Sequence, residues 1–255
     1  MNLPRNLFKA ALNEGRHQLG IWNGIGGNTV SEALAACGYD WVMIDAEHGA
    51  IETGDILPSL QAIAGYADVS AVVRPAQNDA ALIKRLLDFG AQTLLIPFVQ
   101  SGAEAQAAVA AMRYAPRGIR GMAGIQRASR FGFVEDYATR AEEELCLIVQ
   151  IETALGLDRL EEIAATDGVD GVFIGPADLA ASMGYTGNPD HPQVVAACED
   201  AIGRCRAVGV PSGILTLDEG LSRYFTACGT SFNAVGVDLA ILISGAKSLK
   251  GRFVT

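Results

Sequence analysis

The stretch LCLIVQIETALGLDRLEEIAATDGVDGVFIGPADL (145–179) decides the fold class of this chain. It contains two short apolar runs, 145–151 and 169–174, separated by a segment with the spacing of an amphipathic helix. Both runs are continuously apolar rather than alternating, which is typical of parallel strands buried on both faces. Strand, helix and second strand in this order are the repeating unit of α/β proteins.

The same rhythm runs through the rest of the chain. Helical patterns include 79–89, which is followed by Gly90, then 103–113, and a longer one from His191-Pro192 to Val208. Eight strand–helix repeats with no linker between them predict one (β/α)8 (TIM) barrel domain over residues 1–255. The six further apolar runs lie at 19–23, 41–46, 70–74, 93–98, 210–215 and 231–237.

One segment interrupts this rhythm between the fourth and fifth predicted strands. Residues 114–143 include PRGIRGMAGIQRASRFGF (116–133), which is rich in Arg and Gly and longer than an ordinary connection. Long loops inside compact domains are usually functional. Because this segment follows the fourth strand, we expect it to lie over the catalytic mouth of the barrel.

Composition excludes some classes of function and favours a compartment. The 255 residues carry 19 Lys plus Arg against 29 Asp plus Glu, a net charge of −10, which disfavours nucleic acid and anionic membranes as partners. The five cysteines have no zinc-ligand spacing, and we expect them to be reduced and mostly packed as small apolar residues. The N-terminal stretch 1–20 has no apolar signal core and no apolar run is long enough to span a bilayer, so we expect a soluble, cytoplasmic protein.

Polar residues end most of the predicted strands. In barrel enzymes the reacting groups stand at these carboxyl ends, which meet at one rim. Two carboxylates, one imidazole and one guanidinium at that rim are a dense set for a chain with three histidines. The residues that end or follow the strands are Asp45, Glu47, His48, Arg74, Gln150, Glu152, Asp178, Thr216 and Asp238.

Glu152 and Asp178 follow consecutive strands and are therefore neighbours in a barrel, although 26 residues separate them. Two carboxylates plus waters suit a hard divalent cation such as Mg²⁺ or Mn²⁺ and leave positions open for a chelating substrate. The alternative is that these carboxylates pair with loop arginines or cap helices.

His48 and Arg74 are candidates for the chemistry itself. A histidine near a carboxylate can act as a general acid or base near neutral pH, although it can also be a rim residue bonded to the backbone. A guanidinium at a barrel mouth is costly to desolvate unless it meets an anion. That anion can be the substrate, Asp45 or Glu47.

The lysines argue against an imine-forming aldolase, and one glycine cluster gives no clear sign of a phosphate-binding loop. An imine-forming aldolase needs a lysine inside the barrel, and none of the four lysines lies on a predicted strand. The glycines of GIGGN (24–28) follow the first strand as an ordinary turn would. The lysines are Lys9, Lys84, Lys247 and Lys250.

These motifs resemble those of the HpcH/HpaI class II pyruvate aldolases, metal-dependent lyases that act on 4-hydroxy-2-oxo acids. The resemblance covers nearly the whole chain and keeps the family's order of motifs. The family's second-strand motif commonly reads DGEHAP, where this chain has DAEHGA (45–50). The matching motifs are WVMIDAEHG (41–49), VVRP (72–75), DFGAQTLLIPFV (88–99), RYAPRGIRG (113–121), RASR (127–130), VQIET (149–153), GVFIGPADLAASMG (171–184), GNPDHP (187–192) and FNAVGVD (232–238).

The resemblance implies a role for each site residue. Glu152 and Asp178 would hold the metal, Mg²⁺ or Mn²⁺ with Co²⁺ as a further candidate. His48, oriented by Asp45, would be the acid/base residue. The resemblance further makes Arg74 the clamp on the substrate oxygen and places Gln150, Ala177 and Asp178 at the pyruvate site. It also implies a homo-hexamer in which neighbouring subunits exchange the C-terminal helix.

The implied activity is the reversible cleavage of a 4-hydroxy-2-oxo acid to pyruvate and an aldehyde. Two other reactions fit a metal–enolate barrel: CoA-thioester lysis, which the scarcity of lysine disfavours, and decarboxylation of a 2-oxo diacid. A barrel that serves only for binding or assembly is the non-enzymatic alternative. The retained Glu152, Asp178, His48 and Arg74 argue against it.

Overall fold

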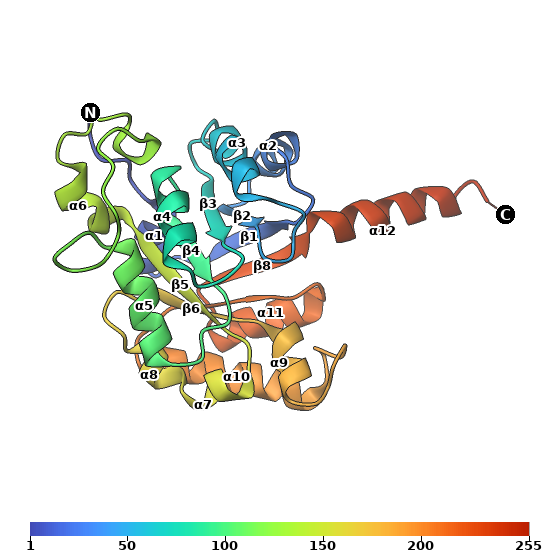
Figure 1. Cartoon of the computed structure of the whole chain (residues 1–255). Helices are drawn as coiled ribbons and strands as arrows, with labels where there is room; N and C mark the ends of the chain where they lie inside the picture. The colour runs from blue at the N-terminus through green and yellow to red at the C-terminus, as the bar shows by residue number, and fades with distance from the viewer. Residues whose placement is uncertain (255) are drawn as a thin grey trace.

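The computed structural model describes residues 1–254 and contains a closed barrel of eight parallel strands (Figure 1). Each strand falls within one of the predicted apolar runs, give or take a residue, so the predicted α/β barrel is confirmed. The strands are β1 (Gln18–Asn23), β2 (Trp41–Asp45), β3 (Ser70–Arg74), β4 (Thr93–Ile96), β5 (Cys146–Ile151), β6 (Gly171–Ile174), β7 (Ser212–Leu215) and β8 (Phe232–Val237).

The strands pair in sequence order, and β1 closes the barrel by pairing with both β2 and β8. The register between β2 and β3 sets Asp45 opposite Arg74, and that between β5 and β6 sets Gln150 opposite Phe173. The carboxyl ends of all eight strands therefore meet at one mouth, where the topology assembles the polar residues that end them.

Helices surround the barrel, and several ends match sequence features. Asp79 caps α4 through the backbone N–H groups of Ala81 and Leu82, and Gly90 follows that helix at a φ of 92°. His191 caps α10 by accepting from the Gln193 backbone N–H, so the predicted start of this helix is confirmed. The helices are α1 (Leu7–Asn13), α2 (Asn28–Ala36), α3 (Thr53–Ile63), α4 (Ala80–Asp88), α5 (Gly102–Met112), the 3₁₀ helix η1 (Arg127–Ser129), α6 (Tyr137–Glu144), α7 (Ala154–Asp158), α8 (Leu160–Ala164), α9 (Pro176–Ser182), α10 (Pro192–Ala207), α11 (Glu219–Cys228) and α12 (Asp238–Gly251).

Aromatic side chains fill the barrel interior and depend on glycines in the strands. A Cβ on Gly20 would lie 2.0 Å from the Trp41 ring, and one on Gly213 would lie 2.2 Å from the Phe232 ring. Phe8 of α1 packs edge-on against both rings, with centroid distances of 5.9 and 5.3 Å. Helix α1 thus closes the amino-terminal end of the barrel, and only the carboxyl end is open to substrate.

The long segment after the fourth strand does not lie over the catalytic mouth, and that prediction was wrong. Helix α5 follows β4 first and returns the chain to the amino-terminal end of the barrel. The insertion then packs there: Arg120 bonds Asp88 at the end of α4, and Arg127 bonds the Phe89 carbonyl. A segment between a helix and the next strand must lie at the end where that strand begins.

Helix α12 extends away from the barrel into solvent (Figure 1). It exposes a run of large apolar residues, among them Ile241 and Leu242, which are 53% and 59% exposed. An isolated helix of this kind leaves apolar area in water that another surface would bury. The predicted domain continues to Thr255, which lies outside the described residues.

Burial of the cysteines follows the expectation for three of the five. Cys146, Cys198 and Cys205 are buried, whereas Cys37 is exposed and Cys228 is half-buried, and all five are free thiols. Among residues 1–254, no helix combines the length and the apolar character needed to cross a bilayer.

Candidate active site

A cavity of about 390 Å³ opens at the carboxyl ends of the strands. It collects residues from β1, β3, β5, β6, β7 and the loops that follow them, so it is the mouth at which the sequence places its reactive groups. Its polar lining comprises His48, Arg74, Gln150, Glu152, Asp178, Asp190, Thr216 and Asp218, and its apolar lining includes Trp22, Phe173, Leu215, Leu217 and Val237.

Arg74 at the end of β3 is fixed by Asp45 at the end of β2. Its Nε and Nη2 donate to the two carboxylate oxygens of Asp45, at 2.8 and 2.7 Å. Trp22 Nε1 donates to the same carboxylate at 3.0 Å, and the Trp22 ring lies 4.9 Å from the guanidinium. This two-point pairing sets the plane of the guanidinium.

The charge of Asp45 is maintained by these contacts. Burial by itself would raise the pKa of this carboxyl, but the hydrogen bonds and charge of Arg74, with the Trp22 N–H, lower it below its usual range. Asp45 is therefore ionised at neutral pH. Its pairing with Arg74, one of the alternatives left open by the sequence, is confirmed.

The third nitrogen of Arg74 points to the pocket side of this pair. Nη1 donates to Gln150 Oε1 at 3.3 Å and lies 2.9 Å from Glu47 Oε2. The Glu47 contact is an ion pair without hydrogen-bond alignment, so this buried oxygen has no hydrogen-bond partner among the described residues. Burial raises the pKa of Glu47, against the lowering effect of Arg74.

Glu152 at the end of β5 is almost completely buried. Its Oε1 accepts from the Phe98 N–H at 2.9 Å, and its Oε2 accepts from Gln150 Nε2. Burial and the nearby charges of Glu47 and Asp178 raise the pKa of Glu152 from 4.5 to about 7. Three carboxylates thus share one small region with too few cations, which is the electrostatic pattern of a cation site.

Glycine 175 makes room for this carboxylate. A Cβ at Gly175 would lie 2.7 Å from Oε2 of Glu152 and 3.1 Å from Nε2 of Gln150. Helix α9 starts with Pro176 in its first turn, and Asp178 in the same turn lines the cavity with Ala177. The predicted neighbourhood of Glu152 and Asp178 is therefore present in the fold.

Glu152 and Asp178 are the two carboxylates that the sequence predicts as ligands of a metal ion at this mouth. Within residues 1–254, no group of three or more His, Cys, Asp or Glu side chains is arranged to hold a metal ion. Glu152 and Asp178 fit a hard cation that keeps waters or a chelating substrate in its remaining positions, and they do not fit a closed structural site.

His48 reaches the cavity from the loop after β2. Its side chain is 65% exposed, and Nε2 lies 3.8 Å from Glu47 Oε2. Asp45 contacts this residue through the backbone, accepting from the His48 N–H at 3.4 Å, while both carboxylate oxygens also bind Arg74. The imidazole is thus free to meet a substrate.

The residues at the mouth differ in part from those that the sequence predicts. Trp22 and the backbone N–H of Phe98 are additions; only the position of Trp22 near the end of β1 marked it in the sequence. Asp238 is removed, because its carboxylate accepts from the backbone of Gly24 and Ile25. Those bonds also make the glycine cluster a structural turn.

Comparison with known proteins agrees with this site. The family model of HpcH/HpaI aldolase/citrate lyase matches residues 18–245. The chain is 56% identical to a pyruvate aldolase of Rhizobium etli over 255 residues, all of both chains. It is 52% identical to a hydroxypyruvate/pyruvate aldolase of Sagittula stellata over 253 residues, 99% of this chain and 100% of the relative.

The solved structures agree as well. A crystal structure of an HpcH/HpaI aldolase/citrate lyase family protein from Burkholderia cenocepacia J2315 superposes with a TM-score of 0.93 at 37% identity, covering 97% of this chain and 99% of that one. Sequence motifs, barrel topology and the position of the acidic and basic groups at its mouth all lead to one assignment. The chain belongs to the HpcH/HpaI aldolase/citrate lyase family.

Proposed function

We propose that this protein is a divalent-metal-dependent class II aldolase that reversibly cleaves 4-hydroxy-2-oxo acids to pyruvate and an aldehyde. The single observation that carries the proposal is the Asp45–Arg74–Gln150–Glu152 network at the floor of the cavity. In it Gln150 connects a fixed guanidinium to a carboxylate suited to a metal. The names of the relatives, which include a 4-hydroxy-2-oxo-heptane-1,7-dioate aldolase of Salmonella at 50% identity, support the same chemistry.

Glu152 and Asp178 are the residues that would hold the cation, Mg²⁺ or Mn²⁺ with Co²⁺ as a further candidate. Burial and the charges of Glu47 and Asp178 raise the pKa of Glu152, which supports the proposal that a cation balances these carboxylates. When bound, such an ion supplies Lewis-acid polarisation of the keto oxygen of a 2-oxo acid.

Arg74 would donate to the substrate oxygen on which negative charge develops as the C3–C4 bond breaks. Asp45 fixes the guanidinium plane before substrate arrives, so no reorganisation is needed during the reaction. Gln150, held between Arg74 and Glu152, and the backbone around Ala177 would line the pyruvate part of the site.

His48 would take the proton from the C4 hydroxyl and return it in the reverse direction. Its exposed imidazole lines the cavity and is close to Glu47, which can stabilise the imidazolium that forms. In this arrangement Asp45 positions Arg74 with its side chain and the His48 main chain through the N–H bond.

The cavity also bears on the competing reactions. Its basic lining consists of Arg74 and His48, and no lysine lines it among the described residues. A CoA thioester carries a diphosphate that needs cationic partners, so this lining disfavours it. Decarboxylation of a 2-oxo diacid uses the same groups and is the second candidate.

The deciding experiment is an aldol assay on the purified protein. Pyruvate, Mg²⁺ or Mn²⁺ and a panel of aldehydes are incubated with it, and condensation products are identified by mass spectrometry. We expect 4-hydroxy-2-oxo acids to form with metal and not with excess chelator. Formation of carbon dioxide from oxaloacetate with no aldol product from any aldehyde would favour the decarboxylase.

A second assay tests the prediction that no lysine forms an imine with pyruvate. Lys9 belongs to α1 and donates to the Leu145 carbonyl, Lys84 lies in α4, and Lys247 and Lys250 lie in α12. Borohydride added with pyruvate should therefore leave the mass of the protein unchanged. A reduced pyruvyl adduct on any lysine would contradict a class II mechanism.

We also infer that residues 1–255 form one barrel domain that assembles into a homo-hexamer through α12, in the cytoplasm. The support is the exposed apolar face of α12 and, for the compartment, five free cysteines. Sedimentation of the wild type should give six subunits. A Leu242→Glu variant should dissociate, because the change buries a charge in the proposed contact.

A further inference from the structure

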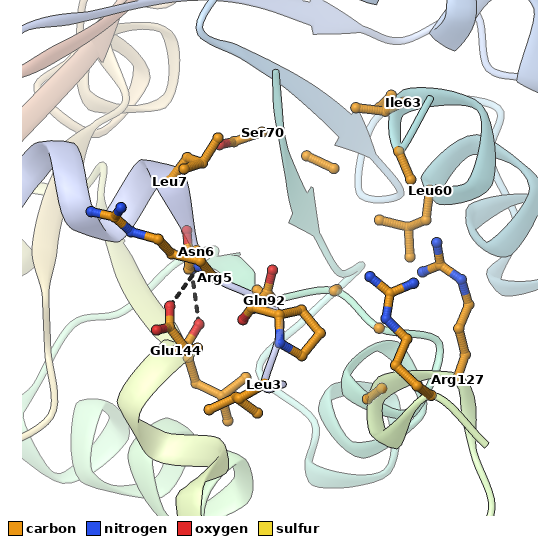
Figure 2. Close-up of a pocket in the computed structure, with 18 of the residues that line it drawn as sticks. Leu3, Arg5, Asn6, Leu7, Leu60, Ile63, Ser70, Gln92, Arg127 and Glu144 are labelled. Carbon is orange, nitrogen blue, oxygen red and sulfur yellow. Dashed lines mark hydrogen bonds between the residues drawn. The ribbon is translucent and has the colours of Figure 1, made fainter. Parts of the chain in front are cut away.

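A second cavity, of about 300 Å³, lies at the opposite end of the barrel from the catalytic mouth. The N-terminal segment before α1, the end of α3, the start of β3 and the insertion at η1 enclose it (Figure 2). Nothing in the proposed reaction uses this cavity. Its lining combines positive charge on one side with apolar side chains, a combination that the barrel fold does not require.

Two arginines of the insertion, Arg127 and Arg130, line the cavity. Arg127 is half-buried, and its guanidinium donates to the Phe89 carbonyl at 2.8 Å. Among the described residues, no carboxylate lies within 4 Å of either guanidinium, whereas most of the other arginines of the chain form such an ion pair. Burial and the charge of Arg130 lower the pKa of Arg127.

The other charged residues of the cavity, Glu144 and Arg5, each have a partner. Glu144, on the side opposite Arg127 in Figure 2, accepts from the Asn6 backbone N–H through Oε2. Arg5 forms an ion pair with Glu14 at 3.6 Å. The two insertion arginines are therefore the positive charges of this cavity that have no ion-pair partner among the described residues, and Glu144 adds one negative charge on the side opposite Arg127.

Apolar residues also line the cavity. Leu60 of α3 lies beside Arg127 in Figure 2, and the half-buried Leu3 and Tyr66 offer apolar surface to the same cavity. A half-buried guanidinium in such surroundings is stabilised by an oxyanion, which its planar donors can bind at two points. Apolar walls favour an anion that carries an apolar body over a bare inorganic ion.

We propose that this cavity is a binding site for a small organic carboxylate, with the carboxylate on Arg127 and Arg130 and its apolar body against the half-buried Leu3 and Tyr66. The ligand would join the insertion to the end of α3 and the N-terminal segment. Since it would bind the native state and not the unfolded chain, its binding should stabilise the fold.

The test is thermal unfolding of the metal-loaded protein with benzoate, acetate or chloride at constant ionic strength. Benzoate should raise Tm saturably, by about 3–6 °C at tenfold its dissociation constant. Acetate, with the same charge and less apolar surface, should need higher concentrations, and chloride should have no saturable effect. Equal effects of benzoate and chloride would overturn the proposal.

Two matched variants locate the effect. Arg130→Gln removes one charge from the cavity and keeps the residue's backbone φ of 52° available at similar cost. Arg140→Gln removes an arginine from the adjacent α6 that pairs with Asp136 and Glu143 outside the cavity. Both keep the catalytic mouth intact, so benzoate bound there would act on both alike.

We expect Arg130→Gln to lose at least half of the benzoate shift and Arg140→Gln to keep it. Equal shifts in the two variants would place benzoate elsewhere and overturn the proposal. A wild type that ignores benzoate, with an Arg130→Gln variant that sediments as smaller assemblies, would make the arginines a contact between subunits and would likewise overturn it.

Discussion

Buried charged side chains at the two ends of the barrel differ in whether a group of opposite charge lies beside them. At the amino-terminal end, Arg120 is completely buried but bonds Asp88 at 2.7 Å, and Lys9 pairs with Asp170 at 3.4 Å and also bonds the Leu145 carbonyl. At the carboxyl end, Glu152 is equally buried, yet its charged neighbours are other carboxylates, and its pKa rises to about 7. Arg120 and Lys9 are thus electrostatically balanced by carboxylates, and Glu152 is not balanced by a cation.

This difference separates stability from function. A balanced ion pair with aromatic packing, such as Arg120 between Tyr114 and Tyr137, holds the insertion in place. An unbalanced buried group such as Glu152 lowers the stability of the protein, and groups of this kind are frequent at functional sites. Substitutions at the two ends should therefore differ in what they change.

The largest effect should come from His48→Ala at the mouth. Loss of the acid/base group should lower the rate of aldol cleavage by about 10²–10⁴. Exchange of the methyl protons of pyruvate involves no C4 hydroxyl and should fall less. His17→Ala, a change of the exposed histidine before β1, is the control and should leave both rates unchanged. Equal losses in the two assays would assign His48 a different step.

Arg74→Lys should have the next largest effect, and it should appear in both assays. The lysine keeps the charge but loses the two-point pairing with Asp45, so the donor would no longer be fixed. Removing one donor to a developing oxyanion costs about 10²–10³ in rate, mainly in kcat. Wild-type rates in cleavage and in methyl-proton exchange would make the arginine structural.

At the amino-terminal end, Arg120→Ala should lower the free energy of unfolding by about 3 kcal/mol and leave kcat of the folded enzyme unchanged. It removes the buried partner of Asp88 and the cation stacked on two tyrosines. The control is Arg117→Ala in the same insertion, an exposed ion pair worth less than about 1 kcal/mol. Denaturant unfolding measures both. A lower kcat in folded Arg120→Ala would contradict the claim that this residue contributes to stability alone.

The sequence predicts the strands and the residues that end them better than it predicts the contacts between side chains. The eight strands were predictable because buried parallel strands are short apolar runs bounded by turns, and the site residues were predictable because they end those runs. The position of the insertion follows from the helix 102–112 that precedes it, because this helix returns the chain to the amino-terminal end of the barrel. The prediction that the insertion covers the mouth considered only that it follows the fourth strand.

Contacts between side chains were the part that could not be predicted. Asp45 could orient either His48 or Arg74, and only the register of β2 against β3 and the rotamers of these residues decide that its carboxylate grips Arg74. The same holds for Trp22, whose indole N–H reaches Asp45 across the barrel mouth, and for Asp238, which binds the turn after β1 instead of a substrate.

The smallest effect should be a change in the pH dependence of stability in Glu152→Gln. In the metal-free protein the pKa of Glu152 is raised from 4.5 to about 7, so its protonated form stabilises the native state. That contribution is complete below pH 4.5 and is lost as pH rises through 7. With chelator at pH 8, Glu152→Gln should exceed the wild type by about 2 kcal/mol, with little difference at pH 4.5. The exposed Glu219→Gln should show no such pH-dependent difference. A constant offset at all pH values would contradict the electrostatic account.

The most direct test of the central claim is deuterium exchange into the methyl group of pyruvate, followed by mass spectrometry. It reports enolate formation without any acceptor aldehyde. We predict exchange by the wild type with Mg²⁺ or Mn²⁺, none with excess chelator, and recovery when metal is returned. Glu152→Gln and Asp178→Asn should bind the metal more weakly in titration calorimetry and lose exchange in parallel. Exchange that persists in chelator, or metal affinity unchanged in both variants, would contradict the assignment of this site.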